Sequence, residues 1–576
     1  MARKSLLWKT GGLAGQGVMT TGLSMSKLAT RSGAYVFDYA EYPSLVQGGH
    51  NTYEVLIQDT QPTASAWTLD CLVCLNEDTF NLHQHRLDEK SLLVYDPADF
   101  KPEDTVAIPL ALPLKELLAE LKANTIMVNT IALGASWALL SGNKTILETL
   151  ITEQFERKGT EVVKQNSACA LAGYDYVLKH FQKHMKNFPW KTDAPAQAVL
   201  TGNDAFSLGA AAADCKFYAA YPMTPASSVL STLAAWQPQT EMIVRHAEDE
   251  VGVVSEALGA SFAGVRSCVG TSGGGFALMT ESLSYAGIAE IPLVLFLSQR
   301  PGPATGLPTW TEQGDLLFAA HAGHGDFPKI ILAPGDQEEM VELTQTAFDL
   351  ADIYQTPVIV MSDKFLSESH ASVSLDSIER IVARVQNRGK NITETPENYL
   401  RYQVTDDGIS PRLIPGVPGA FYQANSYEHS EDSHTTEDAE DRTNQAEKRA
   451  RKLATFIEND YEPCAVYGDL EDAEIIFVSW GSTKGPVSMA REMLEMKTSH
   501  LHFSNVYPLD EEALKNFFKH DGEYVLVENN MTGQFGQLLR QQTGINIERK
   551  ILKYDGRAFY PEEIVAAILQ QQGEAS

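Results

Sequence analysis

The 576-residue sequence has little cysteine, few basic residues and no long apolar run. Its six scattered cysteines do not form a disulfide framework, so we expect a reducing, cytoplasmic setting. Lys and Arg number 45 against 75 Asp and Glu, and this net charge of −30 argues against nucleic acid or a membrane surface as a partner. The longest apolar stretch, near residues 291–297, is far shorter than the ~20 residues of a membrane helix. An anionic substrate would therefore need a locally positive pocket.

What the sequence does contain is a repeated alternation of apolar runs with amphipathic, helix-like stretches. This alternation is typical of βα units around a parallel sheet and predicts the α/β fold class. We expect three Rossmann-like, parallel-sheet domains and one connector. The domains are residues 1–185, 198–384 and 461–576, and the connector is residues 385–460.

The connector carries an acidic run with seven carboxylates between Glu428 and Asp441. Two histidines, His429 and His434, lie within it, and together with the carboxylates they raise the question of a metal site. Runs of like charge are usually solvated, so we interpret this segment as a surface loop and predict no metal site in the chain.

A glycine-rich turn with Gly12, Gly15 and Gly17 follows the first apolar run. Closely spaced glycines let backbone N–H groups approach a phosphate at a helix N-terminus. The spacing departs from the dinucleotide fingerprint, because Thr20 stands where the third glycine belongs. Asp38, some twenty residues on, keeps a nicotinamide site open as a weaker alternative. The turn is equally compatible with a purely structural role.

The only Cys-x-x-Cys pair consists of Cys71 and Cys74, in an apolar, strand-like run. Zinc and iron–sulfur sites need further ligands, and no second pair accompanies this one. We therefore interpret both thiols as small buried apolar side chains.

Four loops of the second predicted domain each follow an apolar strand. They are YPMTP at 221–225, RHAEDE at 245–250, TSGGG at 271–275 and RPGPATGLPTWTEQGD at 300–315. Open α/β sheets place their ligands at the carboxyl ends of the strands, where such loops lie. Each loop alone is compatible with a surface turn, and Glu250 alone with a helix cap. The four together favour a ligand site.

These motifs resemble those of the thiamine-diphosphate-dependent 2-oxoacid:ferredoxin oxidoreductases. The resemblance is to the large alpha-type subunit with a gamma-type domain fused at its N-terminus, and it covers nearly the whole chain. GGLAGQGV and YPSLVQGGHN are similar to the gamma-type domain. YPMTP, EDEVG, TSGGGFALMTE and TGLPTWTEQGD are similar to the pyrimidine-binding thiamine domain. VENNMTGQFGQLLR and YDGRAF are similar to the transketolase C-terminal-like domain.

The resemblance implies an enzyme that decarboxylates a 2-oxoacid on thiamine diphosphate and transfers the acyl group to coenzyme A. Electrons would pass through iron–sulfur clusters to ferredoxin. Thiamine enzymes hold the diphosphate and Mg²⁺ with a GDG…NN motif. Here Asn529-Asn530 follows no such GDG, and cluster cysteines are missing. We therefore expect a beta-type subunit to supply the diphosphate site, Mg²⁺, a 4Fe–4S cluster and most of the ferredoxin docking surface, in a heterodimer or a dimer of heterodimers.

The resemblance also implies roles for single residues. Glu250 matches the glutamate that hydrogen-bonds the aminopyrimidine ring and promotes proton transfer, with Glu248 as the alternative. Thr224 matches a hydroxyl that meets the substrate near its reacting carbonyl, and Arg300 is placed to pair with a substrate carboxylate. The remaining implied contacts are Tyr221, Pro222, Ser272, Gly273 and Gly274 for the cofactor, Trp310 for the substrate, and Gly12, Gly15 and Gly17 for coenzyme A.

Two positions depart from the family pattern. Trp310 stands where relatives acting on 2-oxoglutarate often carry a basic residue, and Gln47 stands where a basic residue is common in gamma-type domains. The domain layout favours 2-oxoglutarate, whereas Trp310 suits monocarboxylic or aromatic 2-oxoacids, so both stay open. The main alternative function is a non-catalytic scaffold that keeps the fold without the chemistry.

Overall fold

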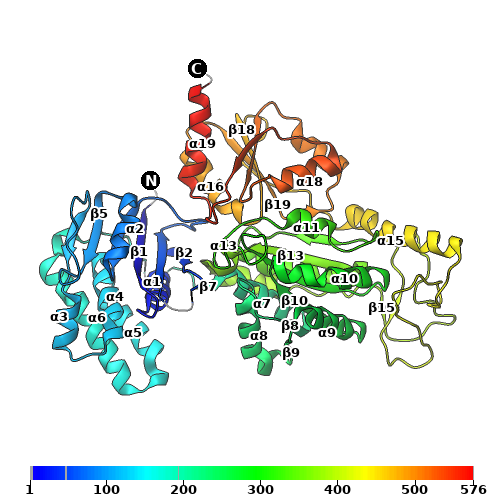
Figure 1. Ribbon diagram of the computed structural model, residues 1–576, viewed down its shortest axis with the longest axis horizontal. Helices are drawn as coiled ribbons and strands as arrows, with labels where there is room; N and C mark the ends of the chain where they lie inside the picture. The colour runs from blue at the N-terminus through cyan, green and yellow to red at the C-terminus, as the bar shows by residue number, and fades with distance from the viewer. Residues whose placement is uncertain (1–3, 46–47, 192–193, 575–576) are drawn as a thin grey trace. The chain divides into compact units, whose positions relative to one another are not determined.

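The computed structural model describes residues 4–45, 48–191 and 194–574, and the chain divides into two compact units. Unit 1 comprises Met1–Leu200, Glu368–Leu375 and Tyr560–Ala566. Unit 2 comprises Thr201–Ser367, Asp376–Phe559 and Ala567–Ser576. Both units contain sheets with many parallel strand pairs, so the predicted α/β class is confirmed (Figure 1). The four-segment division of the chain stays a prediction.

Unit 1 is built on an eight-stranded sheet with the order β6-β5-β4-β1-β3-β2-β14-β7. Strand β1 pairs in parallel with β4 and antiparallel with β3, so the sheet is mixed. Its strands are β1 Ser5–Leu13, β2 Tyr35–Glu41, β3 His50–Gln58, β4 Leu69–Cys74, β5 Leu87–Tyr95, β6 Ile108–Ala111, β7 Gln197–Thr201 and β14 His370–Ser374. Its helices are α1 Val18–Arg31, α2 Glu77–His83, α3 Leu114–Glu120, α4 Val128–Leu139, α5 Lys144–Phe155 and α6 Thr160–His180.

The core of unit 1 joins this sheet to helices α1, α4, α5 and α6. Trp8 on β1 and Trp137 on α4 are fully buried in it. Cys71 and Cys74 on β4 are buried as predicted, and burial raises the pKa of the Cys71 thiol to about 12. Neutral buried thiols behave as small apolar side chains.

Unit 2 contains a seven-stranded sheet with the order β20-β12-β13-β11-β10-β8-β9, parallel except for edge strand β20. Its strands are β8 Cys215–Ala220, β9 Ile243–His246, β10 Arg266–Thr271, β11 Leu293–Gln299, β12 Ile330–Leu332, β13 Pro357–Asp363 and β20 Asn505–Tyr507. The helices that accompany it are α7 Gly202–Ala212, α8 Ser227–Thr240, α9 Glu250–Phe262, α10 Gly273–Ile288, α11 Leu316–His321, α12 Gln337–Tyr354, α13 Lys364–Glu368 and α14 Leu375–Val382.

A five-stranded sheet with the order β17-β19-β18-β21-β22 completes unit 2. One hydrophobic cluster contains Leu295 of β11 together with Val478 of β18 and Leu526 of β21, so the two sheets share a core. The strands are β17 Ala465–Tyr467, β18 Ile475–Trp480, β19 Thr498–Phe503, β21 Glu523–Glu528 and β22 Arg549–Leu552. The helices are α16 Lys484–Met493, α17 Glu511–Leu514 and α18 Gln534–Thr543. The last helix, α19 Pro561–Glu574, has its residues up to Ala566 in unit 1 and the rest in unit 2.

The connector is more ordered than predicted. It contains the short strands β15 Asn391–Ile392 and β16 Arg412–Leu413 and the long helix α15 Ala439–Asn459. Within the acidic run, Glu428 accepts two hydrogen bonds from Arg449 of α15, at 3.0 and 2.7 Å, and His429 is buried. The carboxylates of the run are exposed or half-buried, in line with a solvated segment. The prediction misses that Glu428 is paired with arginines of α15 and that the end of the run, from Ala439, belongs to this helix.

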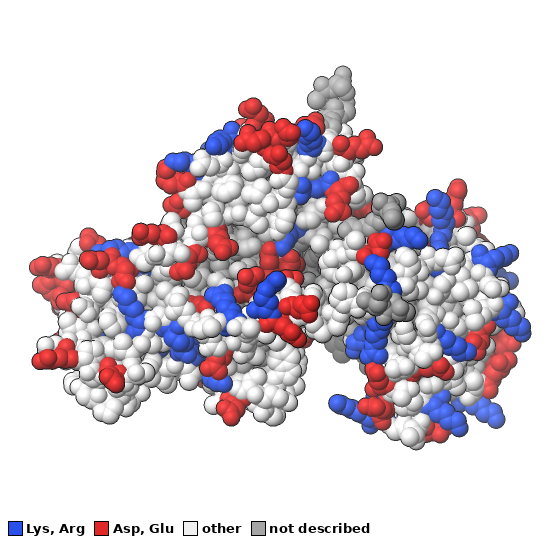
Figure 2. Space-filling view, turned by 180° about the vertical axis from the view of Figure 1, so that it is seen from behind, with Lys and Arg blue, Asp and Glu red and all other residues white. Residues whose placement is uncertain are grey.

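Surface charge and helix composition bear on the predicted partners. Acidic and basic side chains are interspersed on the face drawn in Figure 2, rather than gathered into one continuous basic area. Within the described ranges, no helix combines the length and the apolar character that a bilayer span requires.

Candidate functional site

The candidate site lies in unit 2, at the carboxyl ends of the neighbouring parallel strands β8, β10 and β11. The 221–225 loop follows β8, and the 271–275 loop leads from β10 into α10. The 300–315 loop follows β11 and ends at α11. Because parallel strands end at one edge of the sheet, the three loops meet there, as the sequence predicts.

Glu250 is the first residue of α9, and its side chain is buried at this edge. Asp249 caps the helix by accepting a hydrogen bond from the Gly252 N–H at 2.7 Å. A β-carbon at Gly275 would stand only 2.6 Å from Glu250 Oε1, so the carboxylate is in close contact with the first turn of α10. Glu248 is exposed. The geometry therefore favours Glu250 over Glu248 for the pyrimidine-binding role, which itself stays a proposal.

Two buried polar atoms without partners lie at the N-terminus of α10, one on its N-cap residue Ser272 and one on Asp315 of the 300–315 loop. Neither Ser272 Oγ nor Asp315 Oδ2 has a hydrogen-bond partner among the described residues. A β-carbon at Gly273 would collide with the Asp315 carboxylate, whereas one at Gly274 would meet only the Ala304 carbonyl oxygen, at 4.0 Å. Buried unsatisfied groups are rare in native proteins and are typical of places where a ligand completes the bonding.

Arg300 and Thr224 lie next to each other, as their predicted roles require. Nη1 of Arg300 donates a hydrogen bond to the backbone oxygen of Thr224 at 2.9 Å. The adjacent Tyr221 and Pro222 are exposed, and the Tyr221 ring centroid lies 6.4 Å from that of His246. The loops thus bring the two proposed substrate contacts together and leave the aromatic ring at the surface.

Two carboxylates of the 300–315 loop have perturbed ionisation. Burial raises the pKa of Asp315 to about 6, although the Arg300 guanidinium opposes this shift. Burial, with a smaller contribution from Asp315, raises the pKa of Glu312 to about 7. Burial also lowers the pKa of Arg300, and Asp315 opposes that change. Glu312 and Asp315 are not among the site residues predicted from the sequence. The signal for them is the acidic pair in the TEQGD stretch directly after the proline-rich turn.

Trp310 is half-buried and carries a cation on its ring. The Cζ atom of Arg557 lies 3.1 Å from the centroid of the Trp310 ring. Arg557 belongs to the segment after β22, in the YDGRAF motif, and is not among the site residues predicted from the sequence. Position 310 therefore lacks a charge of its own but has one directly against it.

Asn529 and Asn530 are buried and are used inside the protein. The Asn529 backbone oxygen accepts a hydrogen bond from the Gln313 N–H, and the Asn529 N–H donates to Gln313 Oε1. Asn529 Nδ2 donates to the backbone oxygens of Lys553 and Arg557. Asn530 Nδ2 donates to Glu528. These bonds give both asparagines a structural role, in line with the missing GDG. The described part of the chain holds no group of three or more His, Cys, Asp or Glu side chains arranged to hold a metal ion.

In unit 1 the glycine turn lies between β1 and α1. Gly15 and Gly17 adopt left-handed backbone conformations, with φ of 90° and 75°. A cavity of about 690 Å³ has Leu13 and Gln16 in its wall, together with lysines 115 and 122. Gln47 lies outside the described residues.

Asp38, the residue on which the nicotinamide alternative depends, is buried in unit 1. Its carboxylate accepts a hydrogen bond from Ser26 Oγ at 2.6 Å and from the His370 N–H at 3.0 Å, and it pairs with the His370 ring. These internal bonds leave it poorly placed to bind a ribose, which weakens that alternative.

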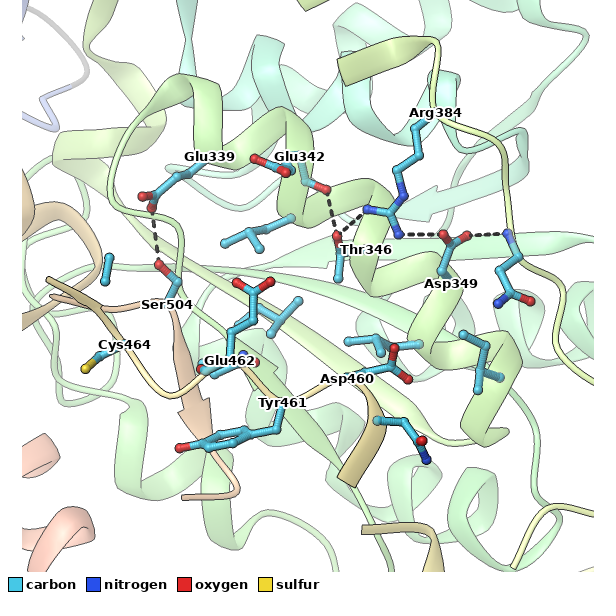
Figure 3. Close-up of a pocket in the computed structure, with 18 residues that line it drawn as sticks. Glu339, Glu342, Thr346, Asp349, Arg384, Asp460, Tyr461, Glu462, Cys464 and Ser504 are labelled. Atoms are coloured by element: carbon cyan, nitrogen blue, oxygen red, sulfur yellow. Dashed lines mark hydrogen bonds and ion pairs between the residues drawn. The ribbon is translucent and has the colours of Figure 1, made fainter. Parts of the chain in front are cut away.

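A separate cavity of about 510 Å³ lies in unit 2, and none of the predicted site residues lines it (Figure 3). Its walls are acidic, but several of its charges are paired within the protein. Arg384 bonds to Thr346 and Asp349, both at 2.7 Å, and Glu339 accepts a hydrogen bond from Ser504. Because an acidic cluster with internal partners does not by itself indicate a ligand, we assign this cavity no role.

Comparison with known proteins decides the family. Residues 8–176 match the family model "Pyruvate ferredoxin/flavodoxin oxidoreductase". Residues 208–448 match "Pyruvate flavodoxin/ferredoxin oxidoreductase, thiamine diP-bdg". The chain is 30% identical to the 2-oxoacid:ferredoxin oxidoreductase subunit alpha of a Sulfolobus species, over 98% of this chain and 96% of that protein. The chain belongs to the 2-oxoacid:ferredoxin oxidoreductase family.

Other relatives agree with this assignment. The 2-oxoglutarate synthase subunit KorA of Methanothermobacter thermautotrophicus is 30% identical, over 64% of this chain and 98% of its own length. The solved structure of the 2-oxoglutarate:ferredoxin oxidoreductase from Magnetococcus marinus, with 2-oxoglutarate, coenzyme A and succinyl-CoA bound, superposes with a TM-score of 0.91 at 29% identity. It covers 99% of both chains. The predicted family, the alpha-subunit type and the presence of a thiamine-diphosphate-binding domain are thus confirmed.

Proposed function

We propose that this 2-oxoacid:ferredoxin oxidoreductase subunit works with a beta-type partner to oxidise a 2-oxoacid, in the first place 2-oxoglutarate. Thiamine diphosphate is the cofactor, coenzyme A takes the acyl group, and ferredoxin takes the electrons. The observation that carries the proposal is the meeting of buried Glu250, the unpartnered Ser272 Oγ and the Arg300–Thr224 pair at one sheet edge. The relatives named for 2-oxoglutarate support the choice of substrate.

The residues at this edge fit the pyrimidine half of thiamine diphosphate. Glu250 offers a buried acceptor for a ring N–H, Ser272 Oγ lacks a partner, and the space at Gly274 is open. When bound, the cofactor supplies the nucleophilic carbon and the electron sink for loss of CO₂. Glu250 then holds the ring and moves a proton at the ring nitrogen that it bonds.

Two further side chains serve the substrate. The Arg300 guanidinium binds the carboxylate next to the 2-oxo group, because a planar fork of donors matches a carboxylate. The Thr224 hydroxyl donates to the 2-oxo oxygen. The hydrogen bond from Arg300 to the Thr224 backbone oxygen fixes the position of the guanidinium relative to the hydroxyl.

The groups that this chain does not supply for the reaction are assigned to the beta-type partner. Asn529 and Asn530 are committed to internal hydrogen bonds, so the diphosphate, Mg²⁺ and the 4Fe–4S cluster belong on the beta-type subunit. We propose a heterodimer or a dimer of heterodimers in the cytoplasm, with ferredoxin docking mainly on the partner. The net charge of −30 supports that docking preference, because ferredoxins are themselves acidic.

We place coenzyme A at the glycine turn of unit 1. The cavity beside the turn has apolar walls for a pantetheine arm, and Lys122 on its wall would supply counter-charge to a phosphate, whereas Lys115 is already paired with Asp99. Gly15 contributes open space, because a β-carbon there would meet no atom within 4 Å. Gly12 lies in strand β1 before this position, and Gly17 is the N-cap residue of α1 after it.

The test is a co-expressed complex with a beta-type partner that carries GDG…NN and cluster cysteines. Wild type is expected to reduce a low-potential acceptor in the presence of 2-oxoglutarate and coenzyme A. Glu250→Gln should lower the rate by about 100-fold or more, since a positioned proton-transfer group contributes roughly 10²–10⁴-fold. The exposed Glu248→Gln is the matched control and should retain the rate. A rate loss below about tenfold for Glu250→Gln would refute its role in proton transfer. If wild type turned over no 2-oxoacid, a non-catalytic scaffold would be favoured instead.

A further inference from the structure

A tight loop follows Arg300 and folds back on itself. The Leu307 N–H donates to the Pro301 oxygen at 3.0 Å, and the Trp310 N–H donates to the Leu307 oxygen at 3.1 Å. Gly306 makes the fold possible, because its φ is 53° and a β-carbon there would collide with the Pro301 oxygen. The loop thereby returns Trp310 toward its own beginning at Arg300.

The segment 553–557 is fastened onto this loop. The Asn529 side chain donates to the backbone oxygens of Lys553 and Arg557, at 2.8 and 3.1 Å, and the Thr311 N–H donates to the Gly556 oxygen at 3.1 Å. Gly556 is so close that a β-carbon on it would lie 3.4 Å from Trp310 Cβ and 3.7 Å from Pro301 Cγ. The neighbour of Arg557 in sequence thus contacts the neighbour of Arg300.

The Arg557 side chain is half-buried and lies over the Trp310 ring. Its guanidinium carbon lies 3.1 Å from the ring centroid. Among the described residues, its side chain has no hydrogen bond and no ion pair. A guanidinium carries five N–H donors around its edge, in a fork that matches a carboxylate. A stacked guanidinium with free donors is prepared to bind an anion.

The charges near Arg300 indicate that a substrate with a second carboxylate needs a second cation. Glu312 and Asp315 belong to the same loop, and both would repel an added negative charge when ionised. Arg300 is already engaged with Thr224 and faces Asp315 electrostatically. One arginine therefore serves one carboxylate, and a dicarboxylic substrate needs another.

We propose that Arg557 binds the distal carboxylate of a dicarboxylic 2-oxoacid and selects such substrates over monocarboxylic ones. Arg300 would bind the carboxylate beside the 2-oxo group, and Arg557, stacked on Trp310, would bind the far one. This inference rests on the proposed function and deepens it by naming the residue that sets the substrate class. Trp310 acts as a positioning residue, because its ring lies against the Arg557 guanidinium.

The experiment compares 2-oxoglutarate with 2-oxobutyrate, which has a methyl group in place of the distal carboxymethyl group. Both are assayed with the complete complex for wild type, Arg557→Met and Arg557→Lys. Arg540→Met, which removes an exposed arginine of α18, controls for the change in net charge. We expect Arg557→Met to lower kcat/KM for 2-oxoglutarate by about 10–100-fold, mainly through KM, since a charged hydrogen bond is worth that much. Activity with 2-oxobutyrate should stay within about threefold in both the Met and control variants.

Arg557→Lys keeps the charge without the fork, so its loss with 2-oxoglutarate should be smaller than that of the Met variant. If the Met variant fails to assemble, the Lys variant is the test. It should lose activity with 2-oxoglutarate and keep activity with 2-oxobutyrate. Equal losses on both substrates would make Arg557 a purely structural link between loops and overturn the proposal. No loss on either, or a wild type that uses 2-oxobutyrate but not 2-oxoglutarate, would overturn it as well. A wild type inactive on every 2-oxoacid would instead refute the proposed function.

Discussion

Two glycine turns of this protein differ in the side chains that lie against them. The turn of unit 1 leads from β1 into α1, and an added β-carbon would meet no atom within 4 Å at Gly15 and the neutral Asn129 side chain at Gly17. The turn of unit 2 leads from β10 into α10, and two carboxylates crowd it. Asp315 lies against Gly273 and Glu250 lies against Gly275.

The difference lies in what each helix N-terminus is able to bind. Both termini offer backbone N–H groups and the positive end of a helix dipole. The open turn leaves these groups available for an external phosphate. The crowded turn already has its own carboxylates at the positive end, which disfavours a second anion and suits a neutral ring with N–H donors. This agrees with a division in which unit 2 holds the pyrimidine and the partner holds the diphosphate.

Gly275→Ala tests the crowded turn and has the largest expected effect of three substitutions. The new methyl group would press against Glu250 and Thr271, and overpacking of this kind costs roughly 1–3 kcal/mol. Calorimetry of the full chain should show the unit 2 transition several degrees lower. Gly274→Ala is the matched control, because its methyl group enters open space and alanine favours a helix. Equal melting temperatures for the two variants would contradict the crowding.

Asp315→Asn tests the charge at the same turn. The folded pKa of Asp315 is about 6, above its ordinary value near 4, so the folded state binds more protons between these values. Stability linked to this group is therefore present at low pH and is lost as the pH rises from about 4 to about 6. Asp315→Asn should raise the melting temperature at pH 8 and change it less at pH 4.

The control for this pH dependence is Asp326→Asn, which alters an exposed carboxylate of the same unit. It should shift the melting temperature equally little at both pH values. A stabilisation by Asp315→Asn that is as large at pH 4 as at pH 8 would show that the effect is not electrostatic.

Gly15→Ala tests the open turn and should have the smallest effect. The position has a φ of 90°, so alanine is strained there by about 1 kcal/mol, but no neighbour is displaced. Gly17→Ala is the comparison, since its methyl group would also collide with Asn129. Calorimetry should rank Gly17→Ala below Gly15→Ala in stability. The reverse order would mean that the room around the added methyl group does not set the relative stability of the two variants.

Much of the candidate site could be predicted from the chain, because its parts are local patterns. An apolar run followed by Gly, Pro or Thr marks the carboxyl end of a strand, and three such ends meet by the rules of parallel sheets. The choice between Glu248 and Glu250 could not be made this way. Glu248 and Glu250 are only two residues apart in the chain. The packing of α9 against α10 determines that Glu250 is the buried carboxylate.

The contacts of the acidic run in the connector could not be predicted, for a related reason. Composition shows the carboxylates of residues 428–441 but not the side chains that meet them. Glu428 is paired by Arg449, and Glu290 in the core is paired by Lys448 and Lys452 of the same helix. Such pairings join segments that are distant in the chain, so local composition does not reveal that Glu428 is paired or that His429 is buried.

By itself, the sequence determined the α/β class and the loops that form the candidate site, and the resemblance of its motifs indicated the family. The class and the loops follow from periodicity and turn chemistry, which depend on near neighbours. Only the tertiary structure decided which groups face each other within those loops. Asp315 lies at the start of α10, and Arg557 lies on Trp310, because burial and close packing join segments that are far apart in the chain. No local pattern encodes such contacts, since their energy depends on the whole fold.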